Sequence, residues 1–161
     1  MLVSFQEMPD TSRLWIYQAE RSLTPDEIVY VEKVFESFVH DWTAHGSELK
    51  ASFKIENNQF LTIILDESNS AASGCSIDAS VGIIRALGDK LGISFLNNDK
   101  VAFLIDGEVE LFPIKNLREN VQKGVLSPDT IIFNNTVKTL AEYKESWRIA
   151  SQETWMKRYF N

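Results

Sequence analysis

The amino-acid sequence predicts an α+β protein in which helices cover mainly one face of an antiparallel sheet of about five strands. Runs with a period of two, typical of half-buried strands, alternate along the chain with runs of period 3.6, typical of amphipathic helices. The turn signals Asn57-Asn58 and Asp106-Gly107 favour tight hairpins, and therefore antiparallel pairing. The resulting order, β-α-β-β-α-β-β-α-β-α-α, contains the β-α-β-β-α-β unit of ferredoxin-like domains in its first six elements.

Length and composition indicate a single globular domain. A chain of 161 residues can bury one core, and we expect residues 1–161 to form one domain. The hydrophobic fraction of 44% is ordinary, and no apolar run approaches the roughly 20 residues that cross a bilayer. The N-terminal segment has no signal-peptide pattern, and one cysteine excludes an internal disulfide. We therefore expect a cytoplasmic protein with no membrane partner.

The charge balance argues against nucleic acid as a partner. The net charge is −7, whereas binding a phosphate backbone needs a clustered basic face. The segment after Lys138 is mildly basic, but its basic and acidic residues are interspersed. That pattern is typical of a solvated helix face.

The first two elements have clear boundaries. Residues 12–18 are apolar on both faces of a strand, which predicts a covered position in the sheet. In the helix that follows, Thr24 is the expected N-cap, Pro25 the first helical residue and Glu27 the partner in a capping box. Gly46 is the expected terminator of this helix. Its predicted core stripe comprises Ile28, Val31, Phe35, Phe38 and Trp42.

The next two strands form the predicted central hairpin. Residues 51–56 alternate between apolar and polar side chains, which predicts a half-exposed strand. Residues 60–65 are apolar on both faces, which predicts a buried strand. In a ferredoxin-like unit the first and third strands are central and the second is an edge, so local pattern and topology agree.

A second long helix is expected from about Ser76 to Leu91, ending at Gly92. Gly88 is expected where this helix lies closest to the sheet. The predicted core stripe of the helix comprises Ile77, Val81, Ile84 and Leu91.

Shorter elements fill the rest of the chain. They are a hairpin over 101–112, a short helix from Ile114 to Gly124, a strand over 131–133, an Asn134-Asn135 turn, and helical pieces over 139–148 and 152–160. The extra C-terminal helices end in the aromatic segment WMKRYF. We expect that segment to dock on its own domain.

The best candidate site is the Ser-rich loop DESNSAASGCSID, which joins the predicted central strand to the second helix. At such a junction, free backbone N–H groups and the positive end of the helix dipole face the loop. The candidate ligand-binding residues are Asp66, Glu67, Ser73, Gly74, Cys75, Ser76 and Asp78.

Cys75 supports two interpretations. The helix dipole favours a reactive thiolate, but the neighbouring acids oppose it and the loop contains no Lys or Arg. The structural interpretation is a small buried hydrophobe that seals the helix against the sheet. A catalytic role would need a base, and His45 is a candidate if the fold brings it to the loop. Placed at a helix C-terminus after Asp41, His45 would also be explained structurally, as a charged imidazolium.

A nucleotide or divalent-cation site at the same loop is a further alternative. The loop lacks the spacing of a phosphate-binding loop and contains no lysine. Its carboxylates suit Mg²⁺ or Ca²⁺, but they follow no recognised ligand spacing. The sequence therefore assigns no metal ligand and defines no cofactor.

Several segments together resemble an uncharacterised family of small bacterial cytosolic proteins: SRLWIYQ, the pair ASFKIE and FLTIILDES, ASGCSID, FNNTV and the late tryptophans. The resemblance covers nearly the whole chain, and ASGCSID is its most distinctive part. Members are sometimes labelled ABC-transporter ATPases, but this sequence has neither a phosphate-loop motif nor an LSGGQ-like signature. The resemblance therefore implies a shared fold and no catalytic residues.

These features favour a binding or regulatory protein over an enzyme. A long polar loop at a helix start suits a small molecule or a protein partner, and no complete catalytic set is present. The alternatives are a thiol-dependent enzyme or redox-sensitive protein that uses Cys75, and nucleotide or divalent-cation binding at the same loop.

Overall fold

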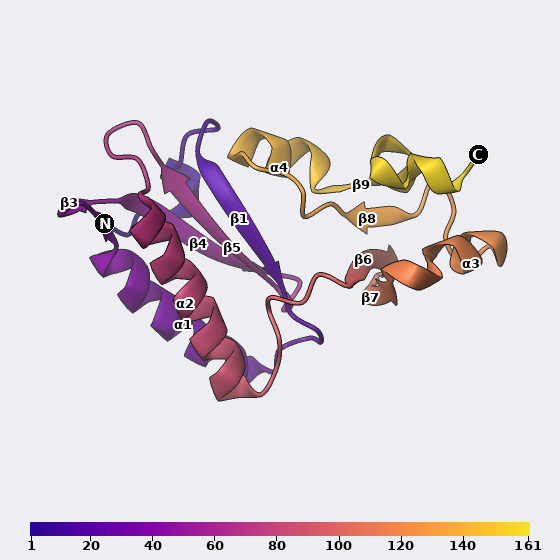
Figure 1. The fold of residues 1–161 in the computed structure, drawn as a ribbon, viewed down its shortest axis with the longest axis horizontal. Helices are drawn as coiled ribbons and strands as arrows, with labels where there is room; N and C mark the ends of the chain where they lie inside the picture. Colours follow the sequence, from indigo (N-terminus) through magenta and orange to yellow (C-terminus); the bar gives the residue numbers. More distant parts are fainter. The chain divides into compact units, whose positions relative to one another are not determined.

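The computed structural model describes residues Met1–Asn161 and confirms the α+β class (Figure 1). Three antiparallel sheets, of three, two and four strands, replace the one sheet of about five strands that the sequence predicted. No helix combines the length and the apolar character that crossing a membrane requires. The α-helices are α1 (Pro25–Asp41), α2 (Gly74–Leu91), α3 (Leu117–Gln122) and α4 (Leu140–Ser146).

The chain divides into two compact units. The first unit consists of Met1–Leu96 and Lys138–Ala141, and the second of Asn97–Val137 and Glu142–Asn161. Helix α4 therefore begins in the first unit and continues in the second. The single domain expected over residues 1–161 stays a prediction.

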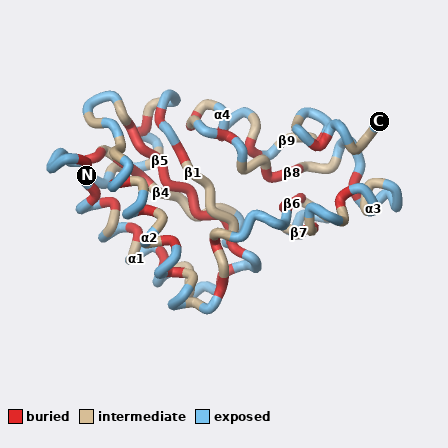
Figure 2. Tube along the Cα trace, in the orientation of Figure 1, coloured by how far each residue is buried: buried red, intermediate tan, exposed pale blue.

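The first unit is built on an antiparallel sheet in the order β1-β5-β4, with β1 at Arg13–Gln18, β4 at Lys50–Glu56 and β5 at Phe60–Asp66. The turn between β4 and β5 uses Asn57 and Asn58, which both have positive φ (51° and 54°), as the sequence predicted. Every residue of the central strand β5 is buried (Figure 2). The doubly buried strand is therefore confirmed, whereas β4 is not half-exposed as predicted, because none of its residues is exposed and the polar Ser52 is buried.

The order β1-β5-β4 matches the first three strands of a ferredoxin-like unit, but the complete unit is not confirmed. The expected fourth strand, β6 (Lys100–Ile105), lies in another sheet and pairs with β7 (Glu108–Pro113) across the Asp106-Gly107 turn. The other edge of β6 pairs with β8 (Ile131–Phe133), so both edges of this strand are occupied within its own sheet. Beside β1, the backbone N–H of Leu14 instead donates to the carbonyl of Lys138 at 3.0 Å.

Helix α1 begins as predicted. The backbone N–H of Glu27 donates to the Thr24 hydroxyl at 3.2 Å, and the Thr24 N–H donates to the Glu27 carboxylate at 2.9 Å. The guanidinium of Arg21 donates two further hydrogen bonds to this carboxylate, at 2.8 and 2.9 Å. The Arg21 bonds, followed by those from Thr24, lower the pKa of Glu27 to about 2.

The end of α1 differs from the prediction. The helix stops at Asp41, and Gly46 terminates no helix. Instead, His45 (φ 52°) and Gly46 (φ 80°) form the turn of a small hairpin between β2 (Thr43–Ala44) and β3 (Ser47–Glu48). A turn with two positive φ values favours glycine at its second position as strongly as a helix end does. His45 therefore does not lie at a helix C-terminus.

Helix α2 begins two residues earlier than predicted, with Ser73 as its N-cap, and ends before Gly92 as predicted. Gly92 has the left-handed φ of 68° that is typical of this position. Gly88 does not mark an approach to the sheet, because a Cβ there would lie 2.7 Å from the carbonyl oxygen of Ile93. The glycine is needed because the chain folds back against α2 after the helix ends.

The buried face of α2 also differs from the predicted stripe. Ile84 is buried as expected, but Ser76 and Ser80 are buried as well. Each serine hydroxyl donates to the backbone carbonyl three residues earlier, at 2.8 and 2.6 Å, which satisfies it inside the core. The remaining residues of the predicted stripe are partly exposed: Ile77, Val81 and Leu91.

Helices α1 and α2 lie on the same side of the three-stranded sheet and bury one core against it (Figure 1). Only one face of β4 enters this core, as its alternating sequence predicted. The buried residues of this core include Val31, Phe35 and Val39 of α1, Ile84 and Leu87 of α2, and Leu61, Ile63 and Leu65 of β5.

The second unit contains a four-stranded antiparallel sheet in the order β7-β6-β8-β9. The hairpin turn at Asp106 (φ 49°) and Gly107 (φ 80°) and the strand β8 (Ile131–Phe133) are confirmed. The strand β9 (Arg148–Ala150) was not predicted. The sequence indicated a helix as far as Arg148, whereas α4 stops at Ser146.

The C-terminal segment forms 3₁₀ turns rather than the expected α-helix. Met156 is fully buried in the core of the second unit, and Tyr159 and Phe160 pack against that core. The aromatic segment therefore docks on its own unit. The 3₁₀ turns of the chain are η1 (Phe5–Glu7), η2 (Ile114–Asn116), η3 (Ser151–Glu153) and η4 (Trp155–Tyr159).

Candidate functional site

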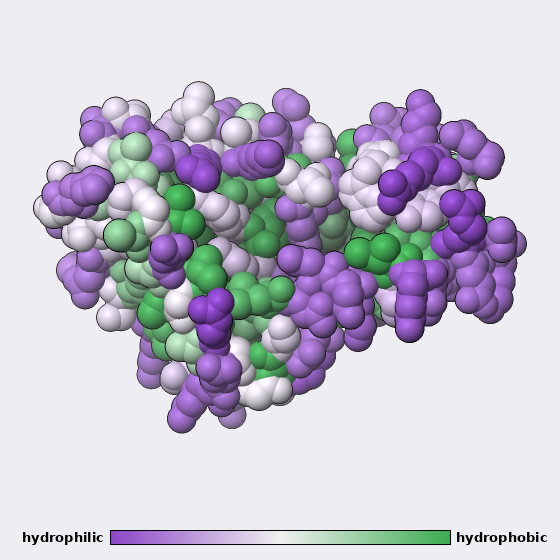
Figure 3. All heavy atoms as spheres, in the orientation of Figure 1, coloured by the Kyte–Doolittle hydropathy of each residue, from purple (hydrophilic) through white to green (hydrophobic).

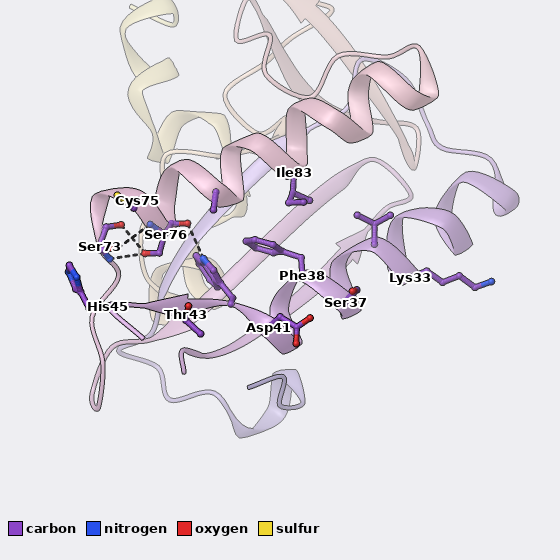
Figure 4. Close-up of a pocket in the computed structure, with 13 residues that line it drawn as sticks. Lys33, Ser37, Phe38, Asp41, Thr43, His45, Ser73, Cys75, Ser76 and Ile83 are labelled. Carbon is purple, nitrogen blue, oxygen red and sulfur yellow. Dashed lines mark hydrogen bonds between the residues drawn. The ribbon is translucent and has the colours of Figure 1, made fainter. Parts of the chain in front are cut away.

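A groove of about 790 Å³ lies between α1 and α2 in the first unit. Its apolar walls are formed by Val34, Phe38 and Trp42 on one side and by Ala79 and Ile83 on the other (Figure 4). Apolar side chains also gather on the surface over these two helices (Figure 3). The groove is thus continuous with the core beneath it, yet open to solvent.

Trp42 fixes the geometry of the groove. Its indole is buried, and the indole N–H donates to the backbone carbonyl of Ser76 at 2.9 Å, which ties the end of α1 to the first turn of α2. The rings of Trp42 and Phe38 pack with their centroids 5.3 Å apart. These two aromatic rings give the groove a rigid wall.

The structure brings Cys75 and His45 to the same groove, at the end where α2 begins (Figure 4). Cys75 lies in the first turn of α2 and is exposed, so its interpretation as a buried hydrophobe is wrong. His45 reaches the groove from the β2–β3 turn. Both side chains are exposed, and no hydrogen bond joins them.

Ser73 and Ser76 line the groove beside Cys75 and also cap α2. The Ser76 N–H donates to the Ser73 hydroxyl at 3.1 Å, and the Ser73 N–H donates to the Ser76 hydroxyl at 2.7 Å. Part of the hydrogen-bonding capacity of these hydroxyls is therefore used to start the helix. The Ser73 hydroxyl can still offer a ligand its O–H donor and a lone pair, whereas the Ser76 hydroxyl is buried and both donates and accepts within the cap.

Asp66 does not reach the groove and instead holds the start of the loop. Its carboxylate is 5% exposed and accepts from the backbone N–H and the hydroxyl of Ser68, at 3.0 and 2.6 Å. The Lys50 ammonium lies 3.4 Å from the other carboxylate oxygen. The Ser68 hydroxyl, above all, keeps the pKa of Asp66 below its ordinary value, against the opposing effect of burial.

The remaining candidate residues of the loop also lie outside the groove. The carboxylate of Glu67 accepts from the backbone N–H of Ala72 at 2.9 Å and lies 3.7 Å from the Arg13 guanidinium. Gly74 and Asp78 are exposed on α2. No group of three or more His, Cys, Asp or Glu side chains lies close enough to hold a metal ion.

The contribution of α1 to the site was missed by sequence reasoning. Phe38 and Trp42 were assigned to the core stripe of α1, and Trp42 is buried as that stripe implies. Phe38 is only partly buried, because its outer side faces the groove rather than the sheet. The available signal was an apolar stripe on α1 wider than one sheet face can cover.

Comparisons with protein-family models, with curated proteins and with solved structures find no match for this chain. The resemblance to a family of small bacterial proteins therefore stays a prediction. No residue receives a role from a relative, and any functional assignment rests on the geometry of the groove.

Proposed function

We propose that this chain is a cytoplasmic binding protein, not an enzyme, whose α1–α2 groove takes a small, largely apolar molecule. One observation carries the proposal: an open groove of about 790 Å³ with aromatic and aliphatic walls. Pockets for small ligands span roughly 300–1,000 Å³ and combine apolar walls with a few polar groups. Here the polar groups gather at one end, where His45, Ser73 and Cys75 can orient the ligand.

The proposal narrows the site expected at the Asp66–Asp78 loop. The end of that loop, from Ser73 to Ser76, contributes to the groove, whereas its acidic start is occupied by bonds within the protein. This arrangement gives less support to a divalent cation or nucleotide at the loop, because Asp66 and Glu67 already have partners.

A dye titration tests the proposal. We expect 8-anilinonaphthalene-1-sulfonate to bind saturably, with enhanced fluorescence, and to raise the melting temperature of the protein. Ala79→Glu places a carboxylate on the wall of the open groove and should weaken dye binding by about tenfold or more, because the bound dye would cover this charge without pairing it and its own sulfonate is repelled by it. Ala71→Glu makes the same change at an exposed loop position outside the groove and should leave binding unchanged. Equal loss in both variants would show that the groove is not the site.

A thiol-dependent function is the second candidate, because Cys75 is exposed and shares the groove with His45. If His45 acts as the base, it must accept the Cys75 proton when a substrate is bound. Iodoacetamide should then alkylate Cys75 more slowly in His45→Gln than in wild type. An equal alkylation rate in wild type and variant would remove His45 from the mechanism.

A further inference from the structure

A second cluster of side chains, at least partly exposed, lies in the second unit, where α3 and η4 are in contact. The guanidinium carbons of Arg118 and Arg158 lie 5.6 and 5.0 Å from the ring centroid of Tyr159. Arg158 also lies 6.0 Å from the ring centroid of Trp155. The Trp155 and Tyr159 rings meet edge to face, with centroids 6.5 Å apart. Two cations and two aromatic rings therefore share one small surface.

The two guanidinium groups have no acidic partner. Neither lies within 4.0 Å of a carboxylate, and their one hydrogen bond runs from Arg158 to the Tyr159 hydroxyl at 3.2 Å. Arg21, by contrast, donates two hydrogen bonds to the Glu27 carboxylate. A guanidinium carries five N–H donors, so most donors of this pair are free for an anion.

The local structure holds these side chains at the surface. Met156 is fully buried, and this anchors η4 while its neighbour Trp155 remains 37% exposed. An exposed indole beside a cation can stack a planar heterocycle, and arginines bind phosphate oxygens with charge-assisted hydrogen bonds. The nearby carboxylate of Glu119 is already paired with Lys123 and does not neutralise the cluster.

We propose that the surface formed by Arg118, Trp155, Arg158 and Tyr159 binds a nucleoside phosphate. The base stacks on Trp155, and the phosphate lies between Arg118 and Arg158. The ligand is a single nucleotide rather than a nucleic-acid strand, because a strand needs an extended basic stripe and the chain has a net charge of −7. This site shares no residue with the apolar groove, so a negative result at either site leaves the proposal for the other unchanged.

An NMR titration of the ¹⁵N-labelled full chain with adenosine 5′-diphosphate tests this site. The Trp155 indole resonance, assigned through Trp155→Phe, should shift saturably, while the Trp42 indole in the groove should not. Arg118→Gln and Arg158→Gln should each weaken binding by about tenfold, the effect of one lost charge-assisted contact. Arg85→Gln is the matched control, because Arg85 is an exposed arginine of α2 without an ion pair, and it should leave the affinity unchanged.

Several outcomes would overturn the proposal. The absence of a saturable shift at Trp155 would exclude the site. If Arg85→Gln weakened binding as much as Arg118→Gln and Arg158→Gln do, the loss of affinity would reflect only the change in net charge. Adenosine binding as tightly as the diphosphate would remove the role of the arginines. A single-stranded oligonucleotide that binds more tightly with each added nucleotide would identify a strand site instead. The three arginines are exposed, so their substitution to glutamine tests binding without unfolding the protein.

Discussion

At the residue scale, one hydrogen bond joins the two helices that form the groove. Replacing Trp42 with Phe keeps the aromatic wall but leaves the buried Ser76 carbonyl without the indole donor. We expect a loss of about 0.5–1.5 kcal/mol in the free energy of unfolding, the usual net contribution of one hydrogen bond, because the Ser76 carbonyl keeps its backbone partner inside α2. Urea denaturation measures it, and Trp155→Phe, at an exposed tryptophan, should change the value by less than about 0.5 kcal/mol.

For a buried hydroxyl on the central strand, we expect the opposite effect, a gain in stability when the group is removed. Thr62 is 1% exposed on the central strand, and its hydroxyl has no hydrogen-bond partner. Thr62→Val keeps the branched shape and removes the unsatisfied group, so the protein should gain about 1 kcal/mol of stability. Thr62→Ser keeps the hydroxyl and loses a methyl group, so it should be destabilised by a similar amount. If urea denaturation shows Thr62→Val to be less stable than wild type, the hydroxyl has a partner after all.

At the element scale, the start of α1 links stability to pH. The pKa of Glu27 is lowered to about 2 in the folded protein, below its ordinary value of 4.5. A lowered folded-state pKa stabilises the protein above the unfolded value, and that contribution is lost as pH falls from about 5 to about 2. In Glu27→Gln, the urea midpoint should therefore fall less steeply over this range. If the urea midpoints of wild type and Glu27→Gln fall equally steeply as the pH is lowered, the Arg21 and Thr24 hydrogen bonds do not stabilise the charged form of Glu27.

Elements defined by a few adjacent residues were predictable, and those defined by distant ones were not. The capping box at Thr24 and the Asp106-Gly107 turn each depend on about four residues, and both are confirmed. Gly46 correctly indicated a position with positive φ, but a helix end and a hairpin turn both use such a glycine, so the residue alone does not distinguish them. The pairing of β6 with β8 joins segments that lie far apart in the sequence, and periodicity does not contain that information.

At the scale of the whole molecule, the difference between features set by adjacent residues and features set by distant residues explains how much of the site was predicted. Ser73, Cys75 and Ser76 were identified because a strand–loop–helix junction is visible in one segment. Phe38 and Ile83 were missed, because a groove exists only once two helices are packed side by side. Sequence pattern assigns an apolar residue to the inside, and only tertiary structure shows which apolar residues remain open.

The first unit is discontinuous in sequence, so a fragment that contains only its N-terminal part should behave differently from the full chain. Its sheet edge at β1 is covered by Lys138–Ala141: the Leu14 N–H donates to the Lys138 carbonyl at 3.0 Å, and the Leu140 N–H donates to the Ser12 carbonyl at 2.8 Å. Leu140 is also fully buried. A fragment of residues 1–96 loses this cover and leaves an unpaired strand edge, which favours association between chains.

We therefore expect the 1–96 fragment to be less stable than the full chain and to self-associate in sedimentation velocity. The full-length variant Leu140→Ala, which keeps the backbone cover and removes only the buried side chain, should lose about 2–5 kcal/mol of stability without associating. The contrast separates the two contributions of the segment, since packing sets the stability and the backbone hydrogen bonds protect the edge. A monomeric 1–96 fragment as stable as the full chain would mean that residues 1–96 fold as a domain of their own.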